Sequence, residues 1–535
     1  MELSSESLAA GTRCSVCVSA AATICLVHPV VSRAPMLCDG GCDARARDRE
    51  STYTHLKSNK GVDWHKRVDV AALPTCTRTK HTYSSGFKDP SSFLPSQNFL
   101  RVHDSVDNST VFRMIRDMPK GAALHVHDTA IVSLDYVYHN LTYRPNLYVS
   151  QRGDSLRLRF FDKPKDDSWT LLSDARNETL DARIKRQLSL EVDADPDVVY
   201  PNGNAVWKKF ISIFVFGRDL ICYRWANYPC FRQRVLEFCL IVYFRRPVFE
   251  DYTYQGLLEF YQDNVLYVEL RTILPTLYDL DGTEYGPMEV ARIYQRVAER
   301  FERDHPDFVG LKLIYAPSRR VNASKVREYV ATARSLVAAF PGFVVGFDLV
   351  SQEDIGLPLV EVADQLLDLN DELPFFFHAG ETNWYGSSSD ENLLDAVLLN
   401  TRRIGHGYAL VKHPELLEMV RRRNIAIELC PVSNQVLALV RDQRNHPASV
   451  LFAADYPVVV SSDDPGLWAA RGLSYDFYEA FLGIMSRRAD LKVFKKLVYN
   501  SIQYSAMSKE DKWKALDIWL NKWQAFINKY LGRVS

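Results

Sequence analysis

The chain has 535 residues, of which 47% are hydrophobic and 12% aromatic, so it can bury a large core and is not a disordered protein. It carries 65 Lys and Arg against 66 Asp and Glu, and this balance excludes nucleic acid or an anionic membrane as a partner bound by overall charge. The length fits one large domain with appendages, or two or three domains.

Residues 1 to about 60 form an irregular, polar segment around one short apolar stretch. That stretch, CSVCVSAAATICLVHPVVS, is too short and too polar to span a membrane. It resembles an atypical signal peptide, because acidic Glu2 and Glu6 precede it and only Arg13 adds positive charge. Four Asn-x-Ser/Thr sequons agree with secretion: Asn108, Asn140, Asn177 and Asn322. The sequence therefore predicts a secreted protein with an atypical signal peptide.

Five of the ten cysteines lie before residue 43. Cys14, Cys17, Cys38 and Cys42 loosely match the spacing of a four-thiolate zinc site. Disulfides or free thiols are the favoured alternative, because no turn or aromatic signature of a zinc ribbon surrounds them. The pairing stays open.

From about residue 120, short apolar runs alternate with amphipathic stretches such as 287–305 and 324–340. Eight runs have the β-branched and aromatic content of buried strands: GAALHVH, NVLYVELR, FVGLKLIY, FVVGFDLV, LPFFFHAGE, TRRIGHG, NIAIELCP and YPVVVSSDDP. Buried strands that alternate with helices predict parallel βα units. Eight such units predict an α/β fold of the TIM-barrel type. A doubly wound sheet is the structural alternative.

Two segments interrupt this rhythm. Residues of about 139–205 form an insertion after the first strand, rich in charge and turns, and residues of about 218–246 form an atypical extra segment rich in Cys, Tyr, Phe and Arg. The C-terminal LDIWLNKWQAFINKYL predicts an amphipathic helix whose aromatic stripe packs on the core.

Polar residues follow several of the apolar runs, where a barrel places its active site. His125 and His127 project from one face of the first strand, since alternate side chains in a strand point the same way. With His378 and Asp463 they offer three imidazoles and a carboxylate, the donor set of a catalytic zinc ion. Further polar residues at these ends suggest proton transfer and substrate contacts: Glu381 as a proton shuttle, His406 to orient the water or take its proton, and Asp464 to bind water or substrate.

These residues stand in motifs that resemble one family. MPKGAALHVHD, FFFHAGET, TRRIGHG, CPVSNQVL, RNHP, SSDDP and GLSYDFYEAF together resemble the secreted adenosine deaminases, also called adenosine-deaminase-related growth factors, over roughly residues 100 to 530. The resemblance implies an eight-stranded barrel over 119–535, one Zn²⁺ per chain on the four residues above, Glu381 as proton donor to the purine and His406 as the base. It also implies substrate contacts by Asp128, Trp207, Ser351 and Asp464.

The sequence departs from the family pattern in its substrate region. Ser351 stands where the family usually has a glycine, and Ser318 stands where many members have a substrate-facing histidine. The 139–205 insertion, similar to the family's receptor-binding insertion, contains no cysteine for the disulfide that some members have. The first 60 residues and the 218–246 segment have no counterpart in the family.

The implied reaction is hydrolytic deamination of adenosine, and of 2′-deoxyadenosine, to inosine and ammonia outside the cell, which would control adenosine signalling. The alternatives are a growth-factor-like binding protein with weak or lost catalysis, and a related deaminase of adenine or a nucleotide. The resemblance further implies a homodimer through a helical extension at 61–118, and a cell-surface receptor or a glycosaminoglycan as partner.

Overall fold

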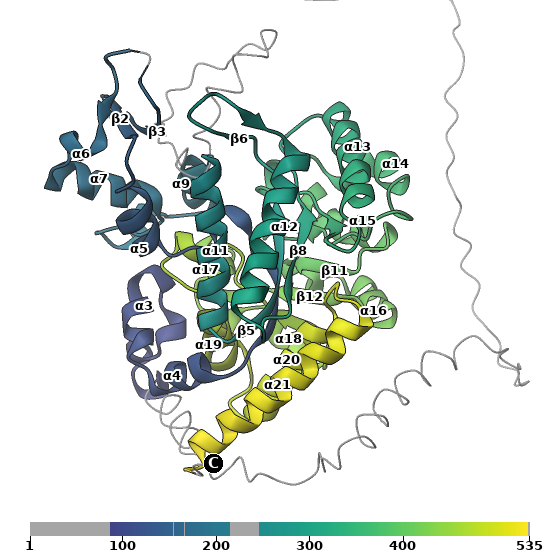
Figure 1. Cartoon of the computed structure of the whole chain (residues 1–535). Coiled ribbons are helices and arrows are strands. Elements are labelled where there is room, and N and C mark those ends of the chain that lie inside the picture. The colour runs from purple at the N-terminus through teal and green to yellow at the C-terminus, as the bar shows by residue number, and fades with distance from the viewer. Residues whose placement is uncertain (1–85, 154, 165, 215–244, 533–535) are drawn as a thin grey trace, which may run out of the picture. The chain divides into compact units, whose positions relative to one another are not determined.

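The computed structural model describes residues 86–532 apart from 154, 165 and 215–244. Parallel strands carry its fold, in two four-stranded sheets ordered β1-β5-β8-β9 and β10-β11-β12-β13. Each predicted apolar run supplies one strand, and Figure 1 shows helices packed around them: β1 Gly121–His127, β5 Val265–Thr272, β8 Gly310–Tyr315, β9 Val344–Phe347, β10 His378–Ala379, β11 Arg403–His406, β12 Ala426–Leu429 and β13 Val458–Val460. The predicted α/β class with parallel strands is confirmed.

Isolated parallel bridges lie at the two borders between the sheets. One joins Phe347 in β9 to Phe375, just before β10, and the other joins Val126 in β1 to Asp463, just after β13. The β10 strand ends at Ala379, because Gly380 takes a φ of +71° and donates its N–H to Glu353. This early exit from the strand places the next residues beside the site.

Several helices between the strands begin with recognisable signals, and α12 shows the amphipathic pattern of a helix that packs on the core. In α12 the residues Val290, Ile293, Tyr294, Val297 and Phe301 recur three or four positions apart and are all buried. Prolines occupy the first turns of α11, α12 and α16. Side-chain caps start α13, α15 and α20. The bounds are α11 Arg246–Gln262, α12 Pro287–Asp304, α13 Ala323–Ala339, α14 Ala363–Leu367, α15 Ser388–Leu398, α16 Pro414–Arg423, α17 Pro431–Val436, α18 Ala448–Ala453, α19 Ser474–Glu479 and α20 Leu491–Gln503.

The predicted C-terminal helix is α21, Lys509–Tyr530. It starts seven residues before the predicted stretch, since Ser508 caps it by accepting from the N–H of Asp511. Trp519, Trp523 and Phe526 are buried, and the indole N–H of Trp519 donates to the carbonyl of Pro119 at 3.1 Å. The aromatic stripe therefore packs on the core, as predicted. No helix in the described ranges is long and apolar enough to cross a membrane.

The insertion at 139–205 contains more regular structure than its charge and turns indicated. Strands β2 (Leu147–Arg152), β3 (Ser155–Phe160) and β4 (Thr170–Leu171) form an antiparallel sheet ordered β3-β2-β4. Alternate residues of β3 are buried, and Leu180, Ile184 and Leu188 form the buried face of α7 in the same hydrophobic cluster. Helix α5, Leu134–Tyr136, lies just before the insertion. The insertion itself contains α6 Leu172–Ala175, α7 Glu178–Leu188, α8 Pro196–Val199 and the first residues of α9 Gly203–Phe214.

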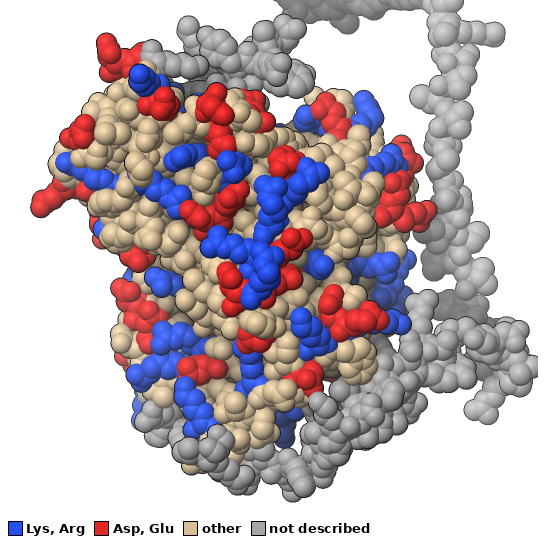
Figure 2. Space-filling model, viewed as in Figure 1, with Lys and Arg blue, Asp and Glu red and all other residues tan. Residues whose placement is uncertain are grey.

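Several predicted segments lie wholly or partly outside the described residues. Residues 1–60 do so entirely, and the 218–246 segment is described only for Arg245 and Arg246, which lead into α11. Of the 61–118 extension, residues from 86 onward contain short 3₁₀ turns followed by α3 (Phe99–Asp107) and α4 (Thr110–Asp117). On the face seen in Figure 2, acidic and basic side chains are intermixed, in keeping with the near-neutral net charge of -1.

Candidate active site

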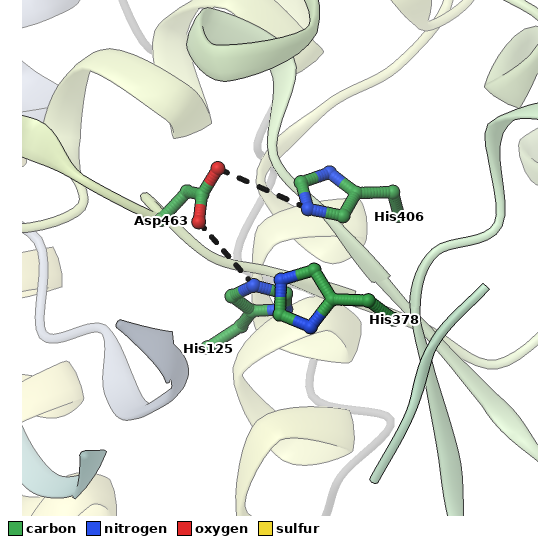
Figure 3. A group of neighbouring side chains, drawn as sticks. All are labelled: His125, His378, His406 and Asp463. Atoms are coloured by element: carbon green, nitrogen blue, oxygen red, sulfur yellow. Dashed lines mark ion pairs between the residues drawn. The ribbon is translucent and has the colours of Figure 1, made fainter. Parts of the chain in front are cut away.

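The polar residues singled out in the sequence lie at the carboxyl ends of the parallel strands. His125 and His127 fall in the last three residues of β1, His378 opens β10, His406 ends β11, and Asp463 follows β13. Because parallel strands present their carboxyl ends at one rim, these side chains meet although 338 positions separate the first from the last (463 − 125). Figure 3 shows His125, His378 and His406 grouped around Asp463.

This group has the donor atoms of a metal site. Ligand atoms of His125, His378, His406 and Asp463 all lie within 4.8 Å of one another, and all four residues are buried. His127 forms a second group with Asp463 and Asp464. From Asp463 Oδ1, the Nε2 atoms of His125 and His127 lie 3.3 and 3.1 Å away. Imidazoles around a carboxylate could hold a divalent metal ion.

Buried carboxylates orient two of these imidazoles. His378 Nδ1 lies 2.6 Å from Asp348 Oδ2, and His125 Nδ1 lies 2.8 Å from Glu428 Oε2. A proton donated from each Nδ1 leaves Nε2 as a bare acceptor, the tautomer that a metal ligand requires. Burial lowers the pKa of His378 to about 3, so this imidazole is neutral near pH 7. His125 Nε2 is buried with no hydrogen-bond partner among the described residues, which fits a metal ligand.

Glu381 is placed beside this group by the turn after β10. Its Oε1 lies 3.7 Å from His406 Nε2 and has no hydrogen-bond partner in the described structure. The backbone N–H groups of Gly380 and Glu381 donate to the Glu353 carboxylate at 3.0 and 2.8 Å, which fixes the turn. Burial, together with the nearby Asp463 and Glu353 carboxylates, raises the pKa of Glu381 well above its ordinary value. A carboxyl that keeps its proton can act as an acid.

His406 and Asp463 both have left-handed backbones. Their φ angles are +58° and +59°, a region that residues other than glycine seldom adopt. The His406 ring is buried, and its Nδ1 lies 3.2 Å from Nδ2 of Asn434 on α17. Asp463 Oδ2 accepts from the hydroxyl of Ser433 at 2.7 Å. These contacts hold both side chains toward the centre of the rim.

Two more carboxyls complete the rim. Burial and the adjacent Asp463 raise the pKa of Asp464 well above its usual range. Burial also raises the pKa of Asp128, whose Oδ2 accepts from the hydroxyl of Tyr294 at 2.8 Å. Protonated carboxyls can donate hydrogen bonds, so both are suited to hold the acceptor atoms of a polar ligand.

Comparison with known proteins identifies the family. Residues 238–521 match the family model described as adenosine deaminase. An adenosine deaminase from Phlebotomus duboscqi is 43% identical over 456 residues, which cover 83% of this chain and 84% of that relative. The chain belongs to the adenosine deaminase family. The family and enzyme class predicted from the motifs are therefore confirmed.

Other relatives of this adenosine deaminase family member agree. The human protein named adenosine deaminase 2 is 42% identical over 450 residues, which cover 81% of this chain and 83% of that protein. A solved amidohydrolase from Burkholderia ambifaria, with bound zinc, has a TM-score of 0.52 at 18% identity and covers 79% of this chain and 95% of its own. At this identity the likeness shows a shared fold.

The other two substrate residues predicted for this adenosine deaminase family member, Ser351 and Trp207, lie in the loop after β9 and on α9. Ser351 follows β9 with a φ of +94°, and Val350 beside it forms a parallel bridge with Ser318. Trp207 lies on α9, partly buried, with its ring 4.9 Å from that of Phe210. The start of α9 contacts the loop after β9, since the side-chain amide of Gln352 donates to Asn204 Oδ1 at 3.3 Å.

Several charged side chains are buried behind the site, and none of them was predicted as a site residue. Arg271 on β5 donates to Asp348 Oδ2 at 2.8 Å and to Glu428 Oε2 at 2.7 Å. Burial alone would raise the pKa of Asp348, but His378 and Arg271 hold it well below its usual range. A charge inside a buried apolar strand needs a buried partner, so charged residues within the predicted runs indicated a buried ionic network. These residues are Glu269, Arg271, Asp348, Arg403 and Glu428.

Proposed function

We propose that this protein catalyses the zinc-dependent hydrolytic deamination of adenosine and 2′-deoxyadenosine, releasing ammonia, outside the cell. The observation that carries the proposal is the buried group of His125, His378, His406 and Asp463 within 4.8 Å, in a chain of the adenosine deaminase family. Bridges between the two sheets support a closed eight-stranded barrel. We include in the proposal the atypical signal peptide, glycosylation and a homodimer through the 61–118 extension.

One zinc ion would be held by His125, His127, His378 and Asp463. We assign His127 as the third imidazole, as the motif resemblance implies. Its Nε2 lies 3.1 Å from Asp463 Oδ1, whereas His406 Nε2 lies 3.8 Å from Asp463 Oδ2. A zinc ion at this place supplies Lewis acidity that makes water a nucleophile near neutral pH.

The remaining residues would bind the substrate and handle protons. Water adds to the amine-bearing carbon of the purine, and Glu381 gives a proton to the neighbouring ring nitrogen. His406 orients the water or takes its proton. Of the two protons of the added water, one goes to the amine, which leaves as ammonia, and the other restores the proton of Glu381, so that the product is inosine. Asp464 would hold the purine and Asp128 the ribose, and contacts are assigned to Trp207 and Ser351. The retained pair of Glu381 and His406, 3.7 Å apart, favours catalysis over pure binding.

The test is inosine formation from adenosine by the purified full chain, with zinc measured on the same sample. We expect one zinc per chain and a turnover that falls about 100-fold or more in Glu381→Gln while zinc is retained. Glu372→Gln, at an exposed acid paired with Arg334, is the matched control and should keep full activity. Bound zinc without turnover would favour the second candidate, a growth-factor-like binding protein with a cell-surface receptor or glycosaminoglycan as partner. That alternative has one motivating observation, the strained Ser351 in the substrate loop.

A further inference from the structure

A chain of buried hydrogen bonds leads from the backbone to His406. The backbone N–H of Ala448 donates to His446 Nδ1 at 3.0 Å. His446 Nε2 lies 3.0 Å from Asn434 Oδ1, and Asn434 Nδ2 lies 3.2 Å from His406 Nδ1. Asn434, His446 and His406 are 0, 1 and 2% exposed, so water does not compete for these contacts. Two motifs with no assigned role supply the chain, CPVSNQVL and RNHP.

The backbone N–H of Ala448, the first donor in this series of hydrogen bonds, sets the direction of the bonds that follow. A backbone N–H is always a donor, so His446 Nδ1 must be an acceptor. Burial lowers the pKa of His446 to about 3, so the ring is neutral near pH 7 and carries its proton on Nε2. That proton needs an acceptor, which orients the Asn434 amide with its oxygen toward His446 and its NH₂ toward His406.

We propose that Asn434 and His446 are positioning residues that fix His406 with its proton on Nε2, so that His406 acts on the attacking water or the substrate as a hydrogen-bond donor. The only lone pair of a neutral His406 ring is then on Nδ1, where the Asn434 NH₂ already donates. This inference rests on the proposed deaminase function and decides between the two roles left open there for His406. It concerns hydrogen-bond donation alone and moves no proton.

The geometry around His406 Nε2 fits a donor. Its nearest acidic oxygens are Glu381 Oε1 at 3.7 Å and Asp463 Oδ2 at 3.8 Å, both beyond hydrogen-bond distance. Glu381 Oε1 also has no hydrogen-bond partner in the described part of the chain. A donor held beside the place where negative charge develops on an oxygen stabilises the transition state.

The first test reads the tautomer directly. In the zinc-loaded full chain labelled with ¹⁵N-histidine, the ring nitrogen shifts and couplings of His406 should show a protonated Nε2 and a bare Nδ1. The signal is assigned by its loss in His406→Gln. A proton on Nδ1 would overturn the proposal, and this readout does not depend on turnover.

The second test reverses the tautomer. In Asn434→Asp both carboxylate oxygens accept, so the His406 proton should move to Nδ1 and Nε2 should lose its donor role. We expect kcat to fall about 100-fold or more with KM and zinc content unchanged. A reversed tautomer with unchanged kcat would refute the role of the donor.

Gln435→Glu is the matched control for placing a carboxylate on α17. Gln435 is also buried, but it contacts Phe99, Gln97 and Arg441, away from His406. This variant should keep the wild-type tautomer and kcat. A loss of kcat equal to that of Asn434→Asp would refute a specific role for the hydrogen bonds from His446 through Asn434 to His406. If Asn434→Asp does not fold, the tautomer of His406 measured in the wild-type protein still tests the proposal. A wild-type chain with zinc and the predicted tautomer but no turnover would overturn the proposed function, while leaving the tautomer assignment in place.

Discussion

The parallel core (the eight parallel strands) and the 139–205 insertion place their charges in opposite ways. In the core, Arg271 pairs with Asp348 and Glu428, and all three side chains are 0% exposed. In the insertion, the pair Arg186–Asp193 is 3.9 Å apart, with side chains 56 and 90% exposed. The core can hold these ionic groups because each has several buried partners, whereas the Arg186–Asp193 pair of the insertion stays in water.

The largest effect is expected from Arg271→Met. This change leaves Asp348 and Glu428 buried without the guanidinium between them, and an uncompensated buried charge costs about 3–5 kcal/mol. Urea unfolding of the metal-free protein measures the loss. Arg334→Met, at an exposed pair with Glu372, should change the free energy of unfolding by less than about 1 kcal/mol. Equal effects of the two variants would remove the contrast between buried and exposed charge.

A buried carboxyl with an unsatisfied oxygen sharpens the comparison. Glu479 on α19 is buried, burial raises its pKa to about 8, and its Oε2 has no partner among the described residues. Because the folded state holds this proton more tightly than the unfolded state, stability falls as pH rises toward 8, by about 1.4 kcal/mol per pH unit. Glu479→Gln should lack this fall when unfolding is measured at pH 5, 6.5 and 8. Parallel pH profiles for both proteins would contradict the prediction.

Leu158→Ala should weaken the packing of the insertion without affecting the parallel core. Leu158 on β3 is fully buried in the insertion, and its loss costs about 2–4 kcal/mol. Since no residue assigned to the site lies between 139 and 205, we expect faster hydrogen exchange in β2 and β3 with kcat unchanged. Leu313→Ala on β8, also buried, should instead destabilise the core. A loss of kcat in Leu158→Ala would mean that the insertion supports the site.

Ser351→Gly should stabilise the loop after β9. The φ of +94° strains a serine by about 1–3 kcal/mol, more than the roughly 0.5–1 kcal/mol that glycine loses through its greater freedom when unfolded. We expect a gain of about 1 kcal/mol in thermal unfolding and a lower KM for adenosine. Ser351→Ala keeps the Cβ atom and should show no such gain; if it does, the strain is not the cause.

The smallest effect is expected from Arg186→Ala in the insertion. Its exposed pair with Asp193 should contribute less than about 0.5 kcal/mol, and high salt should not change the difference measurably. Denaturant unfolding at low and high salt checks this. A loss of more than about 1 kcal/mol in the free energy of unfolding would show that this exposed pair stabilises the insertion.

Elements with strong local signals could be predicted from the amino-acid sequence alone. The eight apolar runs became the parallel strands, and the stretches at 287–305 and 324–340 became α12 and α13. The histidines and carboxylates after these runs could be placed together because the carboxyl ends of parallel strands share one rim. SLRLRF in the insertion also alternates like a strand, but its charged positions hid the pattern.

The partners of the buried charges behind the rim could be found only in the folded structure. The apolar run around Arg271 indicates that this charge needs a buried partner. That the partner is Asp348, 77 positions away, depends on chain segments brought together by folding. The same holds for the chain from Ala448 through His446 and Asn434 to His406. A local sequence pattern predicts which residues stand at the end of a strand. The hydrogen-bond partner that sets a ring's tautomer comes from elsewhere in the fold, so the sequence alone could not identify it.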